Sequence, residues 1–277
     1  MLKQRIITAL VLAPIMVWGI FFLQLDYFAL FAAIIVALGS WEWAHLSGSD
    51  SKPERITYTM GSLTLLSVCY VGQLYFAWFG EAVLWLALLW WLFAFVLVRS
   101  FPRTVAMWGS PRRQRLMGLV VLVPMWTGLY QLKGLAHGNL WILFLMLVIW
   151  GADVGAYFAG KSFGRNKLAP NVSPGKTWEG VVGGLLMVYL VVTVAGLILS
   201  GQPGFDLFHW VVLFVASTLV VLFSIVGDLV ESMVKRNRGV KDSSNLLPGH
   251  GGVMDRADSM CAAVPIFALA LSLFPMG

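Results

Sequence analysis

Residues 209–236 read HWVVLFVASTLVVLFSIVGDLVESMVKR, and this stretch decides the fold. It begins with an apolar run that is long enough to cross a bilayer, since a membrane-spanning helix needs about 20 mostly apolar residues. The run then changes within two helical turns to carboxylates, a hydroxyl and cations. The stretch therefore predicts a transmembrane helix that ends in a charged cluster at the membrane boundary.

The whole chain has the composition of a membrane protein. Of its 277 residues, 59% are apolar or aromatic and 12% are charged, whereas soluble domains carry about 25% charged residues. Nine closely spaced segments come close to spanning length and predict one integral membrane domain over 1–277. They are 6–23, 27–46, 58–77, 81–98, 117–135, 139–159, 180–200, 209–232 and 257–275. The first has no small-residue cleavage site after it, so we expect a retained span.

The placement of positive charge predicts the orientation. With nine spans, all of the 19 Lys and Arg residues except Lys133 fall on the side of the N-terminus. Because cytoplasmic loops carry the excess of Lys and Arg, we expect an all-α polytopic protein with a cytoplasmic N-terminus. The net charge of +6 then fits anionic lipids and phosphates, with no nucleic acid partner. The basic loop 99–116, with Phe101 and Trp108, predicts a membrane-surface anchor, and Cys69 and Cys261 predict apolar packing.

Acidic residues gather at the cytoplasmic ends of the expected spans. Acids in membrane segments are costly and usually have a function or a partner; here they are Glu42, Asp153, Glu179, Asp228, Glu231, Asp255 and Asp258. For Glu42, simple pairing with a nearby Lys or Arg stays an equal alternative. At about 100° per residue, 228, 231, 232 and 235 share one helical face. Carboxylates on two spans suit Mg²⁺, and the neighbouring cations suit phosphates.

A second polar cluster, SPGKTWEG at 173–180, precedes the seventh span. Its hydroxyls, lysine and helix N-terminus suit an anion. The spacing of a P-loop would need a glycine where Pro170 stands, and we expect no strand before it. A capped helix start is the alternative interpretation of this cluster.

The stretch 232–258 reads SMVKRNRGVKDSSNLLPGHGGVMDRAD and closely resembles the signature of the phosphatidate cytidylyltransferases. The segments 173–180, 227–232 and 153–157 also look like motifs of that family, so the resemblance is sharp over 150–258. The signature S-x-x-K-R, K-D and P-x-H-G-G-x-x-D-R-x-D is filled at Ser232, Lys235, Arg236, Lys241, Asp242, Pro248, His250, Gly251, Gly252, Asp255, Arg256 and Asp258. It implies N-terminal helices at 1–135, with catalytic helices and cytoplasmic loops at 136–277.

The resemblance implies a Mg²⁺-dependent transfer in phospholipid biosynthesis. CTP and phosphatidic acid would give CDP-diacylglycerol and pyrophosphate at the cytoplasmic face of a bacterial-type inner membrane. A monovalent cation beside Mg²⁺ and a homodimer are compatible with it. Because the attacking phosphate is already an anion, we expect metal and positioning residues rather than a strong general base.

The expected roles divide the site residues into three groups. Asp228 and Asp255 bind Mg²⁺, with Asp258 or Glu231 as a further ligand, and they form the catalytic set with Lys235 and Arg256. The substrate-binding set is Ser173, Lys176, Thr177, Ser232, Arg236, Lys241, Asp242, His250, Gly251 and Gly252. His250 is equally well explained as a structural loop histidine. A transporter and an ATP-dependent lipid kinase remain the rival functions, whereas the motif of a CDP-alcohol phosphotransferase is not found in the sequence.

Overall fold

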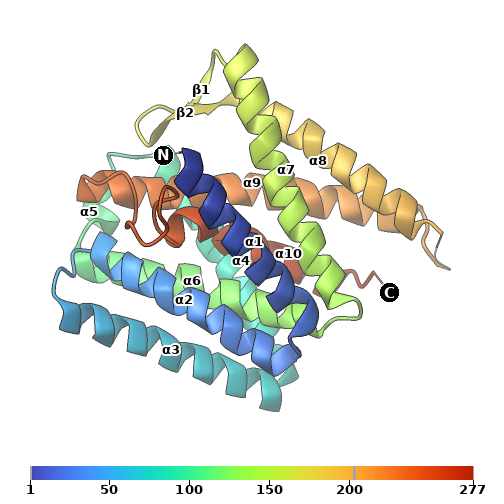
Figure 1. The fold of residues 1–277 in the computed structure, drawn as a ribbon, viewed down its shortest axis with the longest axis horizontal. Coiled ribbons are helices and arrows are strands. Elements are labelled where there is room, and N and C mark those ends of the chain that lie inside the picture. The colour runs from blue at the N-terminus through green and yellow to red at the C-terminus, as the bar shows by residue number, and fades with distance from the viewer. Residues whose placement is uncertain (1, 202–203, 277) are drawn as a thin grey trace.

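The protein is almost entirely helical in a computed structural model that describes residues 2–201 and 204–276 (Figure 1). Of the side chains in residues 2–9, only those of Gln4 and Thr8 belong to the described part, so the expected cytoplasmic cations Lys3 and Arg5 lie outside it. The elements are α1 (Leu2–Phe22), α2 (Leu25–Leu46), α3 (Lys52–Tyr75), α4 (Ala77–Arg99), α5 (Val105–Trp108), α6 (Pro111–Gly134), α7 (Gly138–Phe163), β1 (Lys167–Ala169), β2 (Ser173–Thr177), α8 (Trp178–Leu199), α9 (Leu207–Arg238) and α10 (Met254–Leu273).

Each expected span coincides with a helix, but the count of nine membrane crossings is not confirmed. Within the described residues, seven helices are long and apolar enough to cross a bilayer: α2, α4, α6, α7, α8, α9 and α10. The described apolar part of α1, Leu10–Phe22, is shorter than a full span. Helix α3 is made less apolar by hydroxyl side chains such as Ser62 and Thr64, which donate to carbonyls one turn earlier in the same helix.

Helices α9 and α10 pack side by side at the centre of the molecule. Helices α6, α2 and α3 follow in turn on one side of them, while α7 and α8 pair with each other and cover α9 on the other (Figure 1). The helices cross most closely at glycines, as small residues allow in membrane bundles. A Cβ on Gly227 would lie 2.5 Å from the carbonyl oxygen of Asp258, and one on Gly183 would lie 2.2 Å from Ala159 Cβ. These contacts fix the relative heights of the acidic residues.

One loop prediction is wrong, and another is wrong for one of its residues. Strands β1 and β2 form an antiparallel hairpin in the 160–179 loop, where no strand was expected. Trp108 is only 3% exposed and packs near Phe101, with ring centroids 6.3 Å apart. Its ring is therefore inside the protein rather than anchored in a membrane surface. The packing role of the cysteines is confirmed, because Cys69 and Cys261 are free and buried.

Candidate active site

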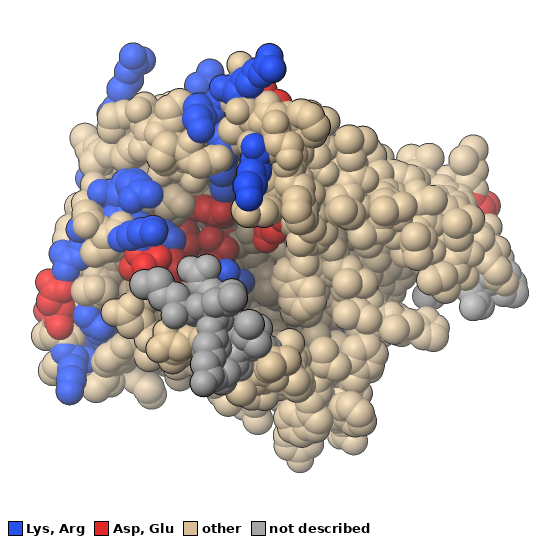
Figure 2. Space-filling model, turned by 45° about the horizontal axis from the view of Figure 1, so that its top comes forward, with Lys and Arg blue, Asp and Glu red and all other residues tan. Residues whose placement is uncertain are grey.

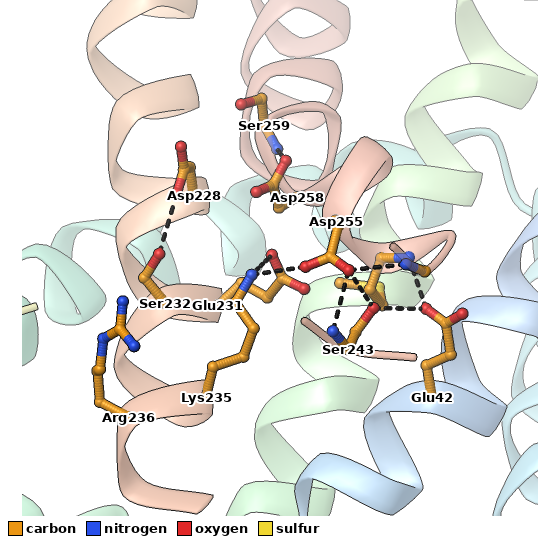
Figure 3. A network of polar contacts seen from close by, with 12 residues as sticks. Glu42, Asp228, Glu231, Ser232, Lys235, Arg236, Ser243, Asp255, Asp258 and Ser259 are labelled. Atoms are coloured by element: carbon orange, nitrogen blue, oxygen red, sulfur yellow. Dashed lines mark hydrogen bonds and ion pairs between the residues drawn. The ribbon is translucent and has the colours of Figure 1, made fainter. Parts of the chain in front are cut away.

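The charged end of α9 presents the predicted stripe of side chains (Figure 3). The helix continues to Arg238, so the residues after the apolar run keep their helical spacing. Ser232 Oγ donates to Asp228 Oδ1 at 3.1 Å, and Lys235 Nζ donates to Glu231 Oε2 at 3.1 Å. Each pair is separated by four residues, the spacing that brings helical side chains together.

Asp255 connects α10 to this stripe. Its Oδ1 accepts a hydrogen bond from Lys235 Nζ at 2.6 Å. Its Oδ2 accepts from the backbone N–H of Ser243 at 2.9 Å, from the Ser243 hydroxyl at 2.9 Å and from the backbone N–H of Gly252 at 2.7 Å. A carboxylate offers about four acceptor positions. Asp255 therefore uses most of its acceptor positions and holds the α9–α10 loop in place.

Glu42 on α2 is a second, buried anchor for the same loop, and its side chain is 1% exposed. Its two carboxylate oxygens face four donors: Ser243 Oγ at 2.9 Å, Ser244 Oγ at 2.5 Å, Val253 N at 2.9 Å and Met254 N at 2.7 Å. The Ser243 hydroxyl has one proton and lies 2.9 Å from Asp255 Oδ2 as well, so the two carboxylates share this donor. Neither Lys nor Arg is among these donors, so the alternative of simple ion pairing is wrong. The carboxylate instead caps the start of α10, where backbone N–H groups lack helical partners.

Gly251 and Gly252 let the loop pass between the two anchoring carboxylates. Gly251 has a φ of +83°, and a Cβ there would lie 2.6 Å from Asp255 Oδ2. A Cβ on Gly252 would lie 2.1 Å from Ser243 Oγ and 2.5 Å from Glu42 Oε2. Only glycine avoids these clashes. Close approach is thus needed for the protein's own carboxylates, a requirement that the sequence pattern did not indicate.

The β1–β2 hairpin brings the second sequence cluster to the first. Lys176 Nζ on β2 lies 2.7 Å from Asp228 Oδ2, with the two side chains 27% and 31% exposed. Arg236 Nε donates to the backbone carbonyl of Val172 at 3.2 Å. Thr177 Oγ1 accepts from Gly180 N at 3.1 Å, which confirms the capped helix start at this residue. Lys176 and Asp228 are 52 residues apart in the sequence, and their ion pair brings the two clusters together in one site.

Carboxyl groups outnumber cations at the centre of this site. Glu231 lies within electrostatic range of Asp258, Asp258 within that of Asp228, and Asp228 within that of Asp153. Glu231 Oε1 is buried and has no donor among the described residues. Among the described residues, no three His, Cys, Asp or Glu side chains are arranged so that they could hold a metal ion. The surplus of oxygen ligands and the orphaned Oε1 nevertheless fit a hard divalent cation such as Mg²⁺.

A cavity of about 400 Å³ opens beside these acids, between α7, α8, α9 and the hairpin. Polar side chains that line it include Asp153, Lys161, Lys176 and Asp228. In Figure 2, Lys and Arg side chains gather over one end of the molecule and acidic side chains lie recessed between them. Lys and Arg side chains therefore gather at the end of the bundle that holds the acids.

Several predicted residues stay apart from this network. Lys241 and Asp242 are exposed, and Ser173 pairs with Ala169 at the opposite end of β2 from Lys176. Arg256 is exposed and within electrostatic range of Asp153. His250 Nδ1 is buried without a hydrogen-bond partner in the described part of the chain. Glu42, Ser243 and Ser244 are the structural site residues that the predicted set omitted.

A helical bundle with carboxylates and cations gathered at one end of its apolar helices defines a class: polytopic membrane proteins with a charged site at one end of their spans. The chain belongs to the cytidylyltransferase family, whose pattern it matches over residues 3–274. It is 49% identical to the phosphatidate cytidylyltransferase of Pseudomonas aeruginosa over 98% of this chain and 97% of the relative. It is 38% identical to the phosphatidate cytidylyltransferase of Haemophilus influenzae over 97% of this chain and 98% of the relative. It is 41% identical to the phosphatidate cytidylyltransferase of Bacillus subtilis over 50% of this chain and 49% of the relative.

Proposed function

We propose that the protein transfers the cytidylyl group of CTP to phosphatidic acid and forms CDP-diacylglycerol and pyrophosphate. The family and the names of the relatives support a phosphatidate cytidylyltransferase. The observation that carries the proposal is the ion pair between Lys176 and Asp228. It joins the two motif clusters at one cavity, where a nucleotide from water and a lipid phosphate from the bilayer can meet.

In the proposed reaction, a phosphate oxygen of phosphatidic acid attacks the α-phosphorus of CTP. The bond from that phosphorus to the β-phosphate bridging oxygen breaks, and pyrophosphate leaves with the electron pair. No proton has to be removed from the nucleophile, which is an anion at neutral pH. The main task of the protein is to hold like-charged phosphates together, and fixed cations stabilise the charge that develops. We assign this task to the cations of the two clusters: Lys176, Lys235, Arg236, Lys241 and Arg256.

The carboxylates are proposed to hold Mg²⁺. When bound, the ion would neutralise phosphate charge and stabilise the leaving group. Asp228, Glu231 and Asp258 are the proposed ligands, because Glu231 Oε1 lacks a donor among the described residues. Asp255 joins this set only if it gives up the bond to Lys235. Ser232 donates to Asp228 and positions its carboxylate. The predicted substrate contacts also include Ser173, Asp242, His250, Gly251 and Gly252.

We further propose nine spans with the N-terminus and the site on the cytoplasmic side of a bacterial inner membrane. One-sided placement of Lys and Arg supports this orientation and is visible at one end of the molecule in Figure 2. Helix α3 is compatible with a crossing because its hydroxyls bond to its own carbonyls. We also propose that two copies of the protein form a homodimer in the membrane.

The test uses purified full-length protein in mixed micelles with labelled phosphatidic acid and either CTP or ATP. CTP- and Mg²⁺-dependent CDP-lipid formation is the expected result, and Asp228→Asn should lower it at least about 100-fold, as loss of one preorganised charged group does. Asp206→Asn is the matched control, since Asp206 caps the opposite end of α9. Near-normal turnover of Asp228→Asn would remove the metal assignment. A product with ATP alone would favour a lipid kinase, and none with either nucleotide would favour a transporter.

A further inference from the structure

A second and larger cavity, of about 740 Å³, lies between α4, the hairpin and α9. Its walls are almost wholly apolar, and two cations, Arg99 and Lys167, are part of its lining. No Asp or Glu is found among the described residues that line it. Its volume lies within the usual range of about 300–1,000 Å³ for small-molecule sites.

The apolar and charged parts of this cavity are separated along the helices. On α4, Leu92, Phe95 and Arg99 lie three and four residues apart and so share a face. Arg99 is in the last turn of α4, at the same end of the bundle as the catalytic acids. The apolar side chains therefore line a path of about 10 Å that leads away from the charged end, at about 1.5 Å per residue.

Helix α9 forms the facing wall with the same periodicity. Leu222, Val226 and Leu229 line the cavity at spacings of four and three residues. Leu222 is 43% exposed, and Phe95 on the opposite wall is 55% exposed. Such exposure of apolar side chains on helices that cross a membrane means that the cavity opens sideways to the bilayer between α4 and α9.

The two cavities adjoin each other. Leu168, Val181 and Ile225 line both of them, so these three side chains form a shared wall. On the far side of this wall lie Lys176 and Asp228. A molecule with an anionic head and an apolar tail can thus place its head near the acids and cations of the site while its tail stays in the second cavity.

We propose that this second cavity is the acyl-chain subsite, in which the lipid substrate enters from the bilayer between α4 and α9. Arg99 and Lys167 attract the phosphate during entry, and the apolar path holds part of a chain. The inference rests on the proposed function, because it takes phosphatidic acid as the occupant. It gives the loop that follows α4 a part in substrate binding, which the sequence did not predict.

The first experiment narrows the cavity with Leu222→Trp and uses Leu219→Trp as the matched control. Both leucines are on α9 and are similarly exposed, at 43% and 38%, but Leu219 does not line the cavity. We expect Leu222→Trp to raise the KM for dioleoyl phosphatidate about tenfold, the effect of losing the burial of about two methylene groups. The KM for CTP and turnover of dihexanoyl phosphatidate should not change. Equal lipid KM values in the two variants would overturn the inference.

Two further measurements separate this inference from the proposed function. Arg99→Gln should raise the KM for phosphatidate while Arg103→Gln, an exposed residue outside the cavity, should not. A phosphatidate analogue with a diazirine in its acyl chain, added without CTP, should label the segment 222–229. Labelling at neither 222–229 nor the facing wall at 92–99 contradicts the subsite even if the enzyme is active. Labelling at 222–229 with no CDP-lipid formed by the unmodified protein supports the subsite and contradicts the proposed activity.

Discussion

Glu42 offers the sharpest test of how the site is held together. Its four donors divide equally between the two oxygens: Oε1 accepts from Ser244 Oγ and Val253 N, and Oε2 accepts from Ser243 Oγ and Met254 N. The hydroxyls can rotate to other acceptors, but the two backbone N–H groups cannot. Glu42→Ala therefore leaves two buried N–H groups without an acceptor, and Glu42→Gln leaves one.

Each unsatisfied buried donor costs about 1–3 kcal/mol. We therefore expect the free energy of unfolding to fall by about 1–3 kcal/mol in Glu42→Gln and by about 2–6 kcal/mol in Glu42→Ala. For a chain of this size the larger loss lowers the Tm by roughly 5–20 °C. Thermal unfolding in detergent micelles measures this, with Glu81→Ala, an exposed acid at the other end of the bundle, as the control.

The order of the two variants is as informative as their size. CDP-lipid formation should fall in the same order, because the loop that carries Gly252 also positions Asp255. A Tm for Glu42→Ala equal to that of the Glu81→Ala control would refute the reasoning. In that case the carboxylate would not be what holds α10 and its loop in place.

Three other changes test separate parts of the structure. Gly252→Ala places a Cβ 2.1 Å from a serine hydroxyl, so we expect CDP-lipid formation to be lost and unfolding to become about 1–3 kcal/mol easier; unchanged activity would contradict this. Gly183→Leu should separate α7 from α8, with a similar fall in stability and loss of the hairpin's protection from limited proteolysis. The Arg238 guanidinium, 2.5 Å from Asp50, holds the pKa of that carboxyl below its usual value. The Tm of the wild type should therefore be higher than that of Asp50→Asn at pH 6, and the difference should disappear below about pH 4 as the carboxyl is protonated. A difference in Tm that persists at pH 2 would rule out a stabilising role for the ion pair.

The helices and the helical stripe were predictable because both depend on local periodicity. An apolar run of spanning length forms a helix in a bilayer whatever lies beside it, and the spacing of Asp228, Glu231, Ser232 and Lys235 fixes a common face. The hairpin was not predictable, since β1 and β2 are only three and five residues long. Such strands show no alternating apolar pattern to indicate them.

The partners of Glu42 were hidden for a different reason. They lie 201 to 212 positions away along the chain, and they are backbone N–H groups and serine hydroxyls that no charge pattern marks. The pairing of Lys176 with Asp228 was equally invisible, because it depends on how the hairpin folds back over α9. The sequence thus indicated Asp228, Lys235 and Asp255 as neighbours, but neither the hydroxyls of Ser243 and Ser244 nor the contacts that join the network.

The hydrogen bonds between Glu42 and the start of α10 also determine when the site can form during synthesis. Glu42 is made early, whereas the N–H groups of Val253 and Met254 are added more than 200 residues later. At about 5–20 residues per second, the ribosome needs on the order of 10–40 s to supply them. Throughout that interval α2 carries a carboxylate whose final partners do not yet exist. We expect the nascent chain to remain dependent on the insertion machinery until its last helix arrives, and a chain truncated before α10 to be degraded rather than stored.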